Sequence, residues 1–161
     1  MNKKNINNIA NFAVKFSEEV ANKECLTVDD ISLNFNQFSV LVTSYAKKLK
    51  KLNLNKGDRV GILLFNSIEY LLLMYASMYA GFVPVNINAR YKAKELNYVL
   101  HDSKCKILFT SSQSDEVTNF SEIISSVYDS TEGQPEELID VYIIGGSKDN
   151  RFRDFKEFKK F

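Results

Sequence analysis

Histidine and cysteine, the residues of metal centres and disulfide frameworks, are scarce in this sequence. Its 161 residues include one histidine and two cysteines, Cys25 and Cys105, which lie far apart and form no CxxC pair. Structural zinc sites need clustered cysteine and histidine ligands, and small secreted domains rely on several disulfides. The sequence therefore argues against both and predicts a protein of the reducing cytoplasm.

An excess of charge of one sign is also absent. Twenty-one lysines and arginines face 20 aspartates and glutamates, for a formal net charge of +1. Such a balance gives no general attraction to nucleic acid or to an anionic membrane, so neither is an expected partner. Lys47, Lys48, Lys50 and Lys51 cluster near the end of a predicted helix, which is typical of a solvated helix C-terminus; a local anion-binding patch is the alternative.

An unbroken apolar segment long enough to cross a membrane is missing. The N-terminus has neither the apolar stretch nor the small-residue cleavage site of a secretory signal. Residues 70–89 carry no charge over about the length that spans a bilayer. Gly81, Pro84 and Asn86 interrupt this stretch, so it predicts a buried helix followed by a buried strand, and no transmembrane segment.

The sequence contains enough apolar residues to form a hydrophobic core. Hydrophobic residues make up 45% of the sequence and aromatic residues 12%, and the length is that of about one globular domain. We find no internal repeat and no shift of composition that would mark a boundary. The sequence therefore predicts one domain over residues 1–161.

The N-terminal third predicts a helix, two short strands and a second helix. Asn22 is expected to end the first helix, and residues 25–28 and 31–33 predict the strands. Asn34 is a candidate N-cap with Gln37 three residues later, which predicts a capping box ahead of the second helix. The first helix rests on four apolar residues at helical spacing: Ile6, Ile9, Ala13 and Phe16.

Strands and helices alternate from residue 57 onward. The first strand, residues 59–65, is followed by a helix. This helix is capped by Asn66 or Ser67, ends at Gly81 and is apolar almost all round, which predicts burial on every side. Alternation of this kind predicts right-handed crossovers and an α/β fold with a parallel sheet and flanking helices. The expected strands are residues 59–65, 82–87, 106–110 and 139–144, and the later helices are residues 93–101 and 117–127.

The C-terminal residues form an amphipathic tail, residues 146–161. Phe152, Phe155 and Phe158 recur at three-residue spacing, and Phe161 continues the series. A stripe of four aromatic rings needs a surface to cover it. The tail therefore predicts a partner surface for this stripe, and docking on another molecule is one alternative.

Two short segments resemble catalytic or phosphate-binding motifs in composition only. His101, Asp102 and Ser103 are consecutive at a helix end, so they cannot form the hydrogen-bonded line of a catalytic triad. Residues 145–148, GGSK, follow a predicted strand as a phosphate loop would. The GxxxxGK spacing followed by serine or threonine is absent, so we interpret them as a plain turn.

A longer pattern points to a known family. Its segments are GDRVGI at residues 57–62, NSIE at 66–69, AGFVPVNINAR at 80–90 and ELNYVLHDS at 95–103. In this order and spacing they resemble the N-terminal region of the adenylate-forming (AMP-binding) superfamily, which includes acyl- and aryl-CoA synthetases. The resemblance is clearest over residues 34–110. It implies a partial N-terminal subdomain of the adenylate-forming enzyme fold.

The resemblance implies an ATP-dependent acyl-CoA synthetase, which converts a carboxylate to an acyl-adenylate and then transfers it to the thiol of CoA. The run NINARY, residues 86–91, most resembles the acyl-CoA synthetase branch, so a fatty or other hydrophobic carboxylate is the expected substrate. ATP, Mg²⁺ and CoA are the expected cofactors of the full-length enzyme. None is expected to bind tightly to this chain alone.

The family's chemistry depends on motifs that these residues do not contain. They are a glycine-rich Ser/Thr loop with a lysine for the phosphates, a glutamate for Mg²⁺, an aspartate for the ribose and a lysine from a mobile C-terminal domain. We therefore predict no catalytic residue and no metal ligand here. The chain is expected to stop just before the phosphate loop and to be inactive alone, with the remainder of the synthetase or a complementary subunit as its partner.

One ligand contact is implied by the resemblance. In some CoA ligases the arginine of the N-x-R pattern contacts a phosphate of CoA, which makes Arg90 a candidate cofactor-binding residue. A guanidinium suits phosphate because it donates paired, charge-assisted hydrogen bonds. The alternative is that Arg90 forms an ion pair with Glu95 or faces solvent.

Two other functions remain open at this point. The chain could be a non-catalytic interaction module, or a truncated pseudoenzyme, that docks through its Phe-rich tail. It could also be a small flavodoxin-like nucleotide binder, because parallel sheets bind ligands at the carboxyl ends of their strands.

Overall fold

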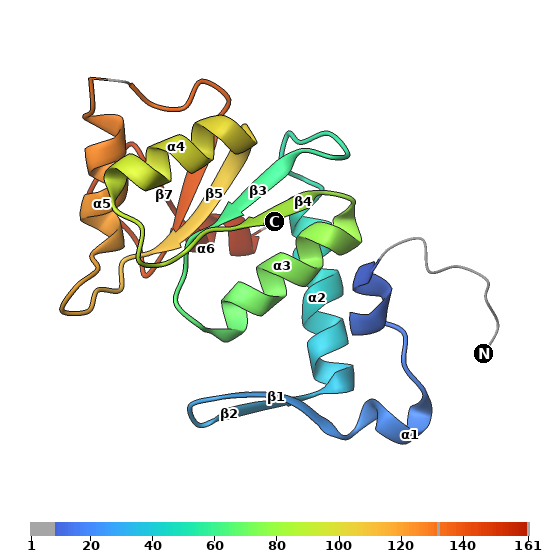
Figure 1. Cartoon of the computed structure of the whole chain (residues 1–161). Helices are drawn as coiled ribbons and strands as arrows, with labels where there is room; N and C mark the ends of the chain where they lie inside the picture. The colour runs from blue at the N-terminus through green and yellow to red at the C-terminus, as the bar shows by residue number, and fades with distance from the viewer. Residues whose placement is uncertain (1–8, 132, 161) are drawn as a thin grey trace. The chain divides into compact units, whose positions relative to one another are not determined.

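The computed structural model describes residues 9–131 and 133–160, which form two compact units (Figure 1). Unit 1 comprises Met1–Gly57 and Asn66–Val83, and unit 2 comprises Asp58–Phe65 and Pro84–Phe161. The chain passes between the units three times. No single position therefore separates them, which is why composition along the sequence shows no boundary.

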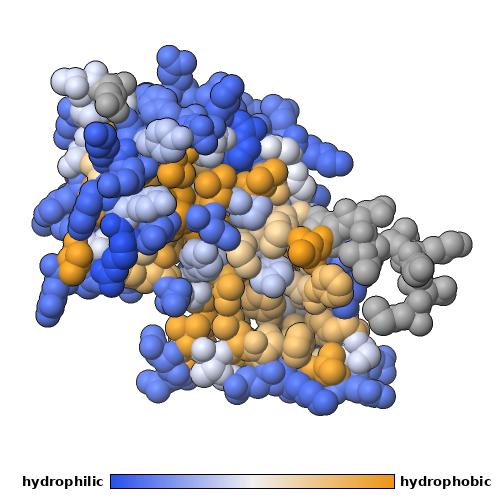
Figure 2. Space-filling model, in the orientation of Figure 1, coloured by the Kyte–Doolittle hydropathy of each residue, from blue (hydrophilic) through white to orange (hydrophobic). Residues whose placement is uncertain are grey.

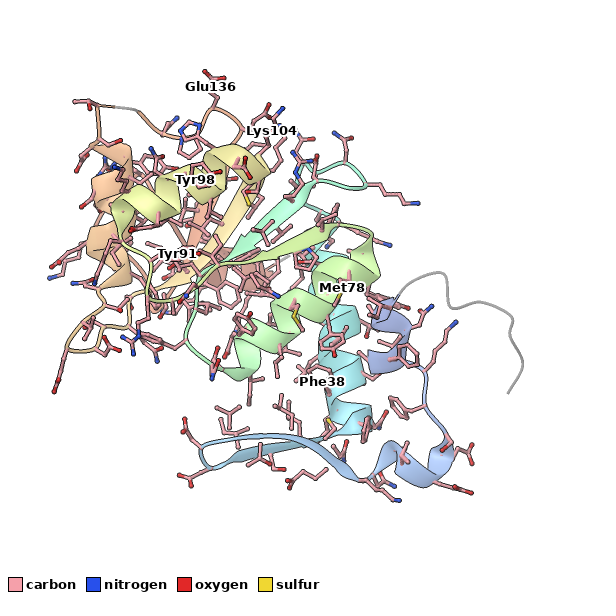
Figure 3. The ribbon with its side chains drawn as sticks, in the orientation of Figure 1. Phe38, Met78, Tyr91, Tyr98, Lys104 and Glu136 are labelled. Carbon is pink, nitrogen blue, oxygen red and sulfur yellow. The ribbon has the colours of Figure 1, made fainter. Side chains whose placement is uncertain are left out.

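Unit 1 joins a β-hairpin to a pair of helices. The two strands predicted at residues 25–28 and 31–33 are present as β1 and β2, and they pair in antiparallel fashion. Helices α2 and α3 pack together, and the rings of Phe38 and Tyr75 meet edge to face with centroids 5.7 Å apart (Figure 3 labels Phe38). The elements are η1 (Ile9–Ala13), α1 (Glu18–Ala21), β1 (Glu24–Val28), β2 (Ile31–Asn34), α2 (Phe35–Leu49) and α3 (Ile68–Ala80).

The prediction of one helix from Ile6 to Asn22 is wrong for the part that the structure describes. A 3-10 turn and a four-residue helix, η1 and α1, replace it. Within η1 only Ala10 and Ala13 are buried, whereas Ile9 is 63% exposed. The apolar residues thus recur at helical spacing without sharing a buried side, so nothing holds a longer helix together. Ile6 lies outside the described residues.

The predicted capping box at the start of α2 is confirmed. Asn34 Oδ1 accepts a hydrogen bond from the backbone N of Gln37 at 2.8 Å, and Gln37 Oε1 accepts one from the backbone N of Asn34 at 2.9 Å. The two side chains satisfy two amide groups that a helix start otherwise leaves without partners.

Removing this cap is expected to destabilise the chain by about 1 kcal/mol, because Asn34→Ala leaves the Gln37 amide without its side-chain acceptor. The free energy of unfolding from urea titration measures the loss. Asn36→Ala, at an exposed position of the same helix, is the matched control and should change stability by less than about 0.5 kcal/mol. Equal losses in both variants would contradict a capping role.

Helix α3 begins and ends as predicted but is buried on one side only. Ser67 Oγ accepts from the backbone N of Tyr70 at 3.2 Å, and Gly81 ends the helix with φ +94°. Such a φ favours glycine, which has no Cβ to clash. The prediction of burial all round is wrong, because only four positions, which form one stripe, are fully buried and the rest are half-buried. The four are Leu72, Leu73, Ala76 and Ser77.

Unit 2 is an α/β structure that confirms the predicted parallel sheet with flanking helices. The strand order is β4-β3-β5-β6-β7, and the pairs β3–β5, β5–β6 and β6–β7 run parallel. The strands are β3 (Arg59–Ile62), β4 (Val83–Asn86), β5 (Cys105–Ser111), β6 (Asp140–Ile144) and β7 (Arg153–Asp154). The helices are α4 (Ala93–Ser103), α5 (Phe120–Tyr128) and α6 (Phe155–Lys160).

Two apolar layers cover the sheet of unit 2. Successive residues of a strand point to opposite faces, so Leu108 and Phe109 of β5 contact different layers. Leu108 belongs to a buried cluster with Leu100 of α4 and Ile124 of α5. Phe109 packs on α6, while Tyr98 stands on the outer side of α4, 68% exposed (Figure 3).

The aromatic tail is part of this packing. Phe155 and Phe158 meet the ring of Phe109 at centroid distances of 5.9 and 5.1 Å, and Phe152 meets Tyr128 at 5.1 Å. All three tail residues are at most 7% exposed. The prediction that this stripe needs another molecule is therefore wrong, because the chain's own sheet and α5 cover it. Phe161 lies outside the described residues.

Within the part of the chain that the structure describes, no helix has the length and apolar character needed to cross a membrane. The uncharged stretch at residues 70–89 divides into a helix, α3, and a strand, β4, separated by Gly81, as predicted. The prediction that the strand is buried is wrong: the residues of β4 are half-buried or exposed, and β4 lies at the edge of the sheet.

Candidate functional site

Arg90, the candidate phosphate ligand, lies in the loop after β4 and is held by the loop after β5. Its Nη1 donates to Asp115 Oδ2 at 2.7 Å and to Thr118 Oγ1 at 3.1 Å. The guanidinium also lies over the ring of Phe65, 5.7 Å from the centroid. The backbone N of Arg90 donates to Asn88 Oδ1 at 2.9 Å, which fixes the turn that carries it.

Neither predicted alternative, an ion pair with Glu95 or a side chain in solvent, fully describes the contacts of Arg90. Glu95 does not pair with it; the Glu95 carboxylate accepts from the backbone N of Lys92 at 3.1 Å and so caps α4. The Arg90 side chain is 56% exposed, yet its ion-pair partner is Asp115, 25 residues further along. Sequence analysis missed Asp115 and Thr118. The available signal was that both loops follow strand ends, where parallel sheets place their ligand-binding residues.

Asp115 is held in turn by its own loop. Its Oδ1 accepts from the backbone N of Val117 at 2.9 Å and of Thr118 at 2.7 Å. The Val117 N–H, the Arg90 guanidinium and the Thr118 N–H together hold the pKa of Asp115 below its ordinary value. A lowered carboxyl pKa stabilises the fold above the unfolded-state pKa, and this contribution is lost as pH falls through the folded pKa. Asp115 is therefore ionised at neutral pH.

A second cation joins the same two loops. Lys92 Nζ donates to the backbone O of Val117. We call Arg90, Lys92, Asp115, Val117 and Thr118 the loop clasp. It borders an open hollow of about 490 Å³, which also includes Glu116, Asn119 and Glu122.

The GGSK segment is a turn, as the sequence predicts. Gly145 and Gly146 both have left-handed backbones, with φ +90° and +82°. The turn lines a hollow of about 760 Å³ at the ends of β5 and β6. Its one lysine, Lys148, shares this hollow with three carboxylates, which disfavours a triphosphate. They are Glu122, Asp149 and Asp154.

His101, Asp102 and Ser103 occupy the last turn of α4 and form no triad. Ser103 Oγ donates to the backbone O of Val99 at 2.6 Å, a bond within the helix end. Arg59 caps this end from β3: its Nε donates to Ser103 O at 2.7 Å and its Nη2 to Lys104 O at 2.9 Å. Sequence analysis gave Arg59 no role, because the bonds span more than 40 residues.

Unit 1 carries a separate, apolar hollow of about 230 Å³. Phe12, Phe38, Leu71 and Tyr75 contribute to its walls, and Cys25 lies among them. In Figure 2 apolar residues gather over this unit's helices and hairpin. Burial raises the pKa of the Cys25 thiol, so it stays protonated at neutral pH and is a poor nucleophile. Among the described residues no group of His, Cys, Asp and Glu is arranged to hold a metal ion.

A family model described as AMP-binding enzyme matches residues 13–157. The chain belongs to the AMP-binding enzyme family. Membership confirms the predicted resemblance and separates the chain from flavodoxin-like nucleotide binders.

Curated relatives of this AMP-binding chain are CoA ligases. The medium-chain acyl-CoA ligase ACSF2, mitochondrial, of Rattus norvegicus is 37% identical over 92 residues, or 56% of this chain and 15% of that protein. The long-chain-fatty-acid–CoA ligase FadD13 of Mycobacterium tuberculosis is 37% identical over 79 residues, or 49% of this chain and 16% of that protein. The chain thus spans about one sixth of the length of these relatives.

Solved structures show the same fold. The anthranilate CoA ligase AuaEII, in complex with anthranoyl-AMP, has a TM-score of 0.80 at 24% identity, over 95% of this chain and 28% of that chain. The N-terminal domain of FACL13 from Mycobacterium tuberculosis has a TM-score of 0.64 at 28% identity, over 72% of this chain and 27% of that chain. These likenesses confirm the predicted N-terminal fold of adenylate-forming enzymes.

In this AMP-binding chain, the loop clasp joins the loop after β4 to the loop after β5 through the side chains of Arg90 and Lys92.

Proposed function

We propose that this chain supplies the N-terminal part of an ATP-dependent acyl-CoA ligase, which activates a carboxylate as an acyl-adenylate and transfers the acyl group to CoA. The match of residues 13–157 to the AMP-binding model carries this proposal. The names of the medium-chain and long-chain relatives favour a fatty or other hydrophobic carboxylate as the substrate class. Two free cysteines are in keeping with a reducing compartment such as the cytoplasm.

The residues present fit one of the three expected cofactors. Arg90 suits a phosphate of CoA, because its guanidinium is exposed and oriented. For ATP, the glycine turn shares its hollow with three carboxylates, which disfavours a triphosphate there. In this proposal the phosphate loop and the catalytic lysine come from the remainder of the synthetase or from a complementary subunit.

The alternative of an interaction module that docks through the Phe-rich tail has lost its main support. The rings on which it relied are buried against the chain's own sheet.

The chain alone is expected to release no pyrophosphate from ATP in the presence of Mg²⁺ and fatty acids of 6–18 carbons, because it lacks the motifs that bind the phosphates and stabilise the transition state. A coupled pyrophosphate assay tests this against a protein-free blank. Release that depends on the fatty acid would show that the chain is an enzyme by itself.

Joining the chain to the rest of a ligase tests whether it can supply the N-terminal part of a working enzyme. In the fusion, residues 1–157 replace the whole N-terminal segment of FadD13 that is equivalent to them, and the remaining part of FadD13 alone is the control. Recovery of acid-dependent pyrophosphate release only in the fusion would support the proposed role. A folded fusion with no more activity than the control would count against it.

A further inference from the structure

The apolar hollow of unit 1 has walls from four elements. Phe12 of η1, Leu26 of β1, Phe38 of α2 and Tyr75 of α3 all line it. Each of its lining residues, all within the described ranges, is uncharged, and its volume is about 230 Å³. Phe12 is nevertheless 59% exposed. Removing such a surface from water is favourable, so the hollow suits an apolar partner.

The β1–β2 sheet beside the hollow is polar on one side and apolar on the other. Thr27 and Ser32 lie opposite each other, and their hydroxyls donate to the Glu24 carboxylate at 2.7 and 2.6 Å. Leu26 and its partner Leu33 are the next pair along the strands, so they point to the opposite side. Since Leu26 lines the hollow, the apolar side is the one that faces it.

The apolar side of this sheet continues to the end of the hairpin. Val28 and Ile31 are the following pair on that side, and Ile31 is 58% exposed. Within the described residues the sheet consists of β1 and β2 only. A sheet of two strands depends on packing against other apolar surfaces for its stability. The hairpin therefore gains stability from a partner on its apolar side.

Helix α3 brings a second half-buried surface to the hollow. Leu71 and Tyr75 are four residues apart, so they lie on one side of the helix. Both line the hollow and are half-buried, whereas the stripe that includes Leu72 and Ala76 is fully buried. A helix that is apolar almost all round is expected to be covered all round. The half-buried side of α3 therefore needs further cover.

The size of the relatives indicates what provides this cover. Nearly all of this chain matches the fold of AuaEII, whereas most of that chain has no counterpart here. We propose that the remaining part of the ligase docks on unit 1 and fills the hollow with apolar side chains, beside the apolar side of the β1–β2 sheet. This rests on the proposed function, in which the chain is the N-terminal part of such an enzyme.

Cys25 serves as a probe of docking, because it lines the hollow and is half-buried. The experiment measures the rate at which N-ethylmaleimide labels Cys25, by mass spectrometry of the peptide that contains it, in the chain alone and in the fusion with FadD13. We expect labelling to be about tenfold slower in the fusion, since the reagent then reaches Cys25 only after a local opening. Cys105 is 0% exposed and should stay unlabelled in both.

Tyr98→Cys is the matched control for accessibility. Tyr98 belongs to unit 2 and is 68% exposed on the outer side of α4. A cysteine there should react at the same rate in the chain alone and in the fusion. A fusion that slows both cysteines equally would indicate nonspecific association and would overturn the proposal.

Phe12→Gln tests the apolar contact itself. With 59% exposure the ring adds little to the stability of the chain alone, so the midpoint of urea unfolding should not change. In the fusion the polar amide opposes docking, so Cys25 should be labelled about fivefold faster than in the unaltered fusion, each rate taken relative to its own chain alone. Tyr98→Gln, the corresponding change in unit 2, should leave this relative rate unaltered.

Equal labelling of Cys25 in the chain alone and in a folded fusion would overturn the proposal. Labelling of the chain alone that slows as its concentration rises would assign the hollow to a second copy, which would overturn it too. The pyrophosphate assay reports on the ligase role separately. An active fusion with unprotected Cys25 would reject the docking surface alone, whereas an inactive fusion with protected Cys25 would reject the ligase role and retain the surface.

Discussion

Phe158→Ala is expected to lower the free energy of unfolding of unit 2 by about 3–5 kcal/mol. Phe158 is 0% exposed and its ring meets Phe109, Phe155 and Tyr142 at centroid distances of 5.1, 5.3 and 6.0 Å. Alanine would leave a cavity at the centre of these three rings. A loss of this size is a large share of the total stability of a small domain.

Urea unfolding followed by tyrosine fluorescence measures this loss, and Phe158→Leu keeps the measurement possible if the alanine variant does not fold. Leucine retains much of the buried volume, so its loss should be clearly smaller. Lys156→Ala is the control on the same helix, because Lys156 is exposed and its hydrogen bond to Asp154 Oδ1 is donated by the backbone N. A loss below about 1 kcal/mol in Phe158→Ala would mean that α6 does not cover the sheet in solution.

Gly145→Val is expected to be the second most damaging single change, with a loss of about 3 kcal/mol. At φ +90° a β-branched side chain is strained by roughly 1–3 kcal/mol. A Cβ at this position would also lie 2.2 Å from Ser112 Oγ and 3.4 Å from Ser112 Cβ. The backbone and the neighbouring side chain therefore both oppose the substitution.

Gly133→Val separates these two causes. Gly133 also has a left-handed backbone, φ +76°, but an added Cβ would meet nothing within 4 Å. Its variant should show the backbone strain alone, measured by the same urea titration. Combining Gly145→Val with Ser112→Ala removes the closest atom and should recover part of the difference. Equal losses for the two glycines would show that contact with Ser112 does not matter.

Local signals in the sequence were sufficient for much of the fold. The capping box at Asn34, the end of α3 at Gly81 and the two strands β1 and β2 each depend on residues close in sequence, and each was predicted. The parallel sheet followed from the alternation of strands and helices. The family resemblance rested on the order of short segments, and the match of residues 13–157 confirmed it.

The errors share a physical cause, which is long-range contact. Periodicity marks the aromatic tail as apolar but cannot say that β5 and β6 cover it. The partner of Arg90 was sought five residues away, at Glu95, whereas Asp115 reaches it from another loop. Ile9 and Ala13 show the opposite error: their spacing is helical, but Ala13 is buried and Ile9 is exposed.

The division of each unit into two stretches of chain sets the order in which a ribosome can complete them. Unit 1 has all its residues once Val83 has been made. Strand β3 ends at Ile62, but its neighbour β5 is finished only at Ser111, roughly 50 residues later. At about 5–20 residues per second, one edge of β3 stays without its final partner for about 2–10 s. During translation this edge is therefore open to wrong pairing and to chaperones that bind extended segments.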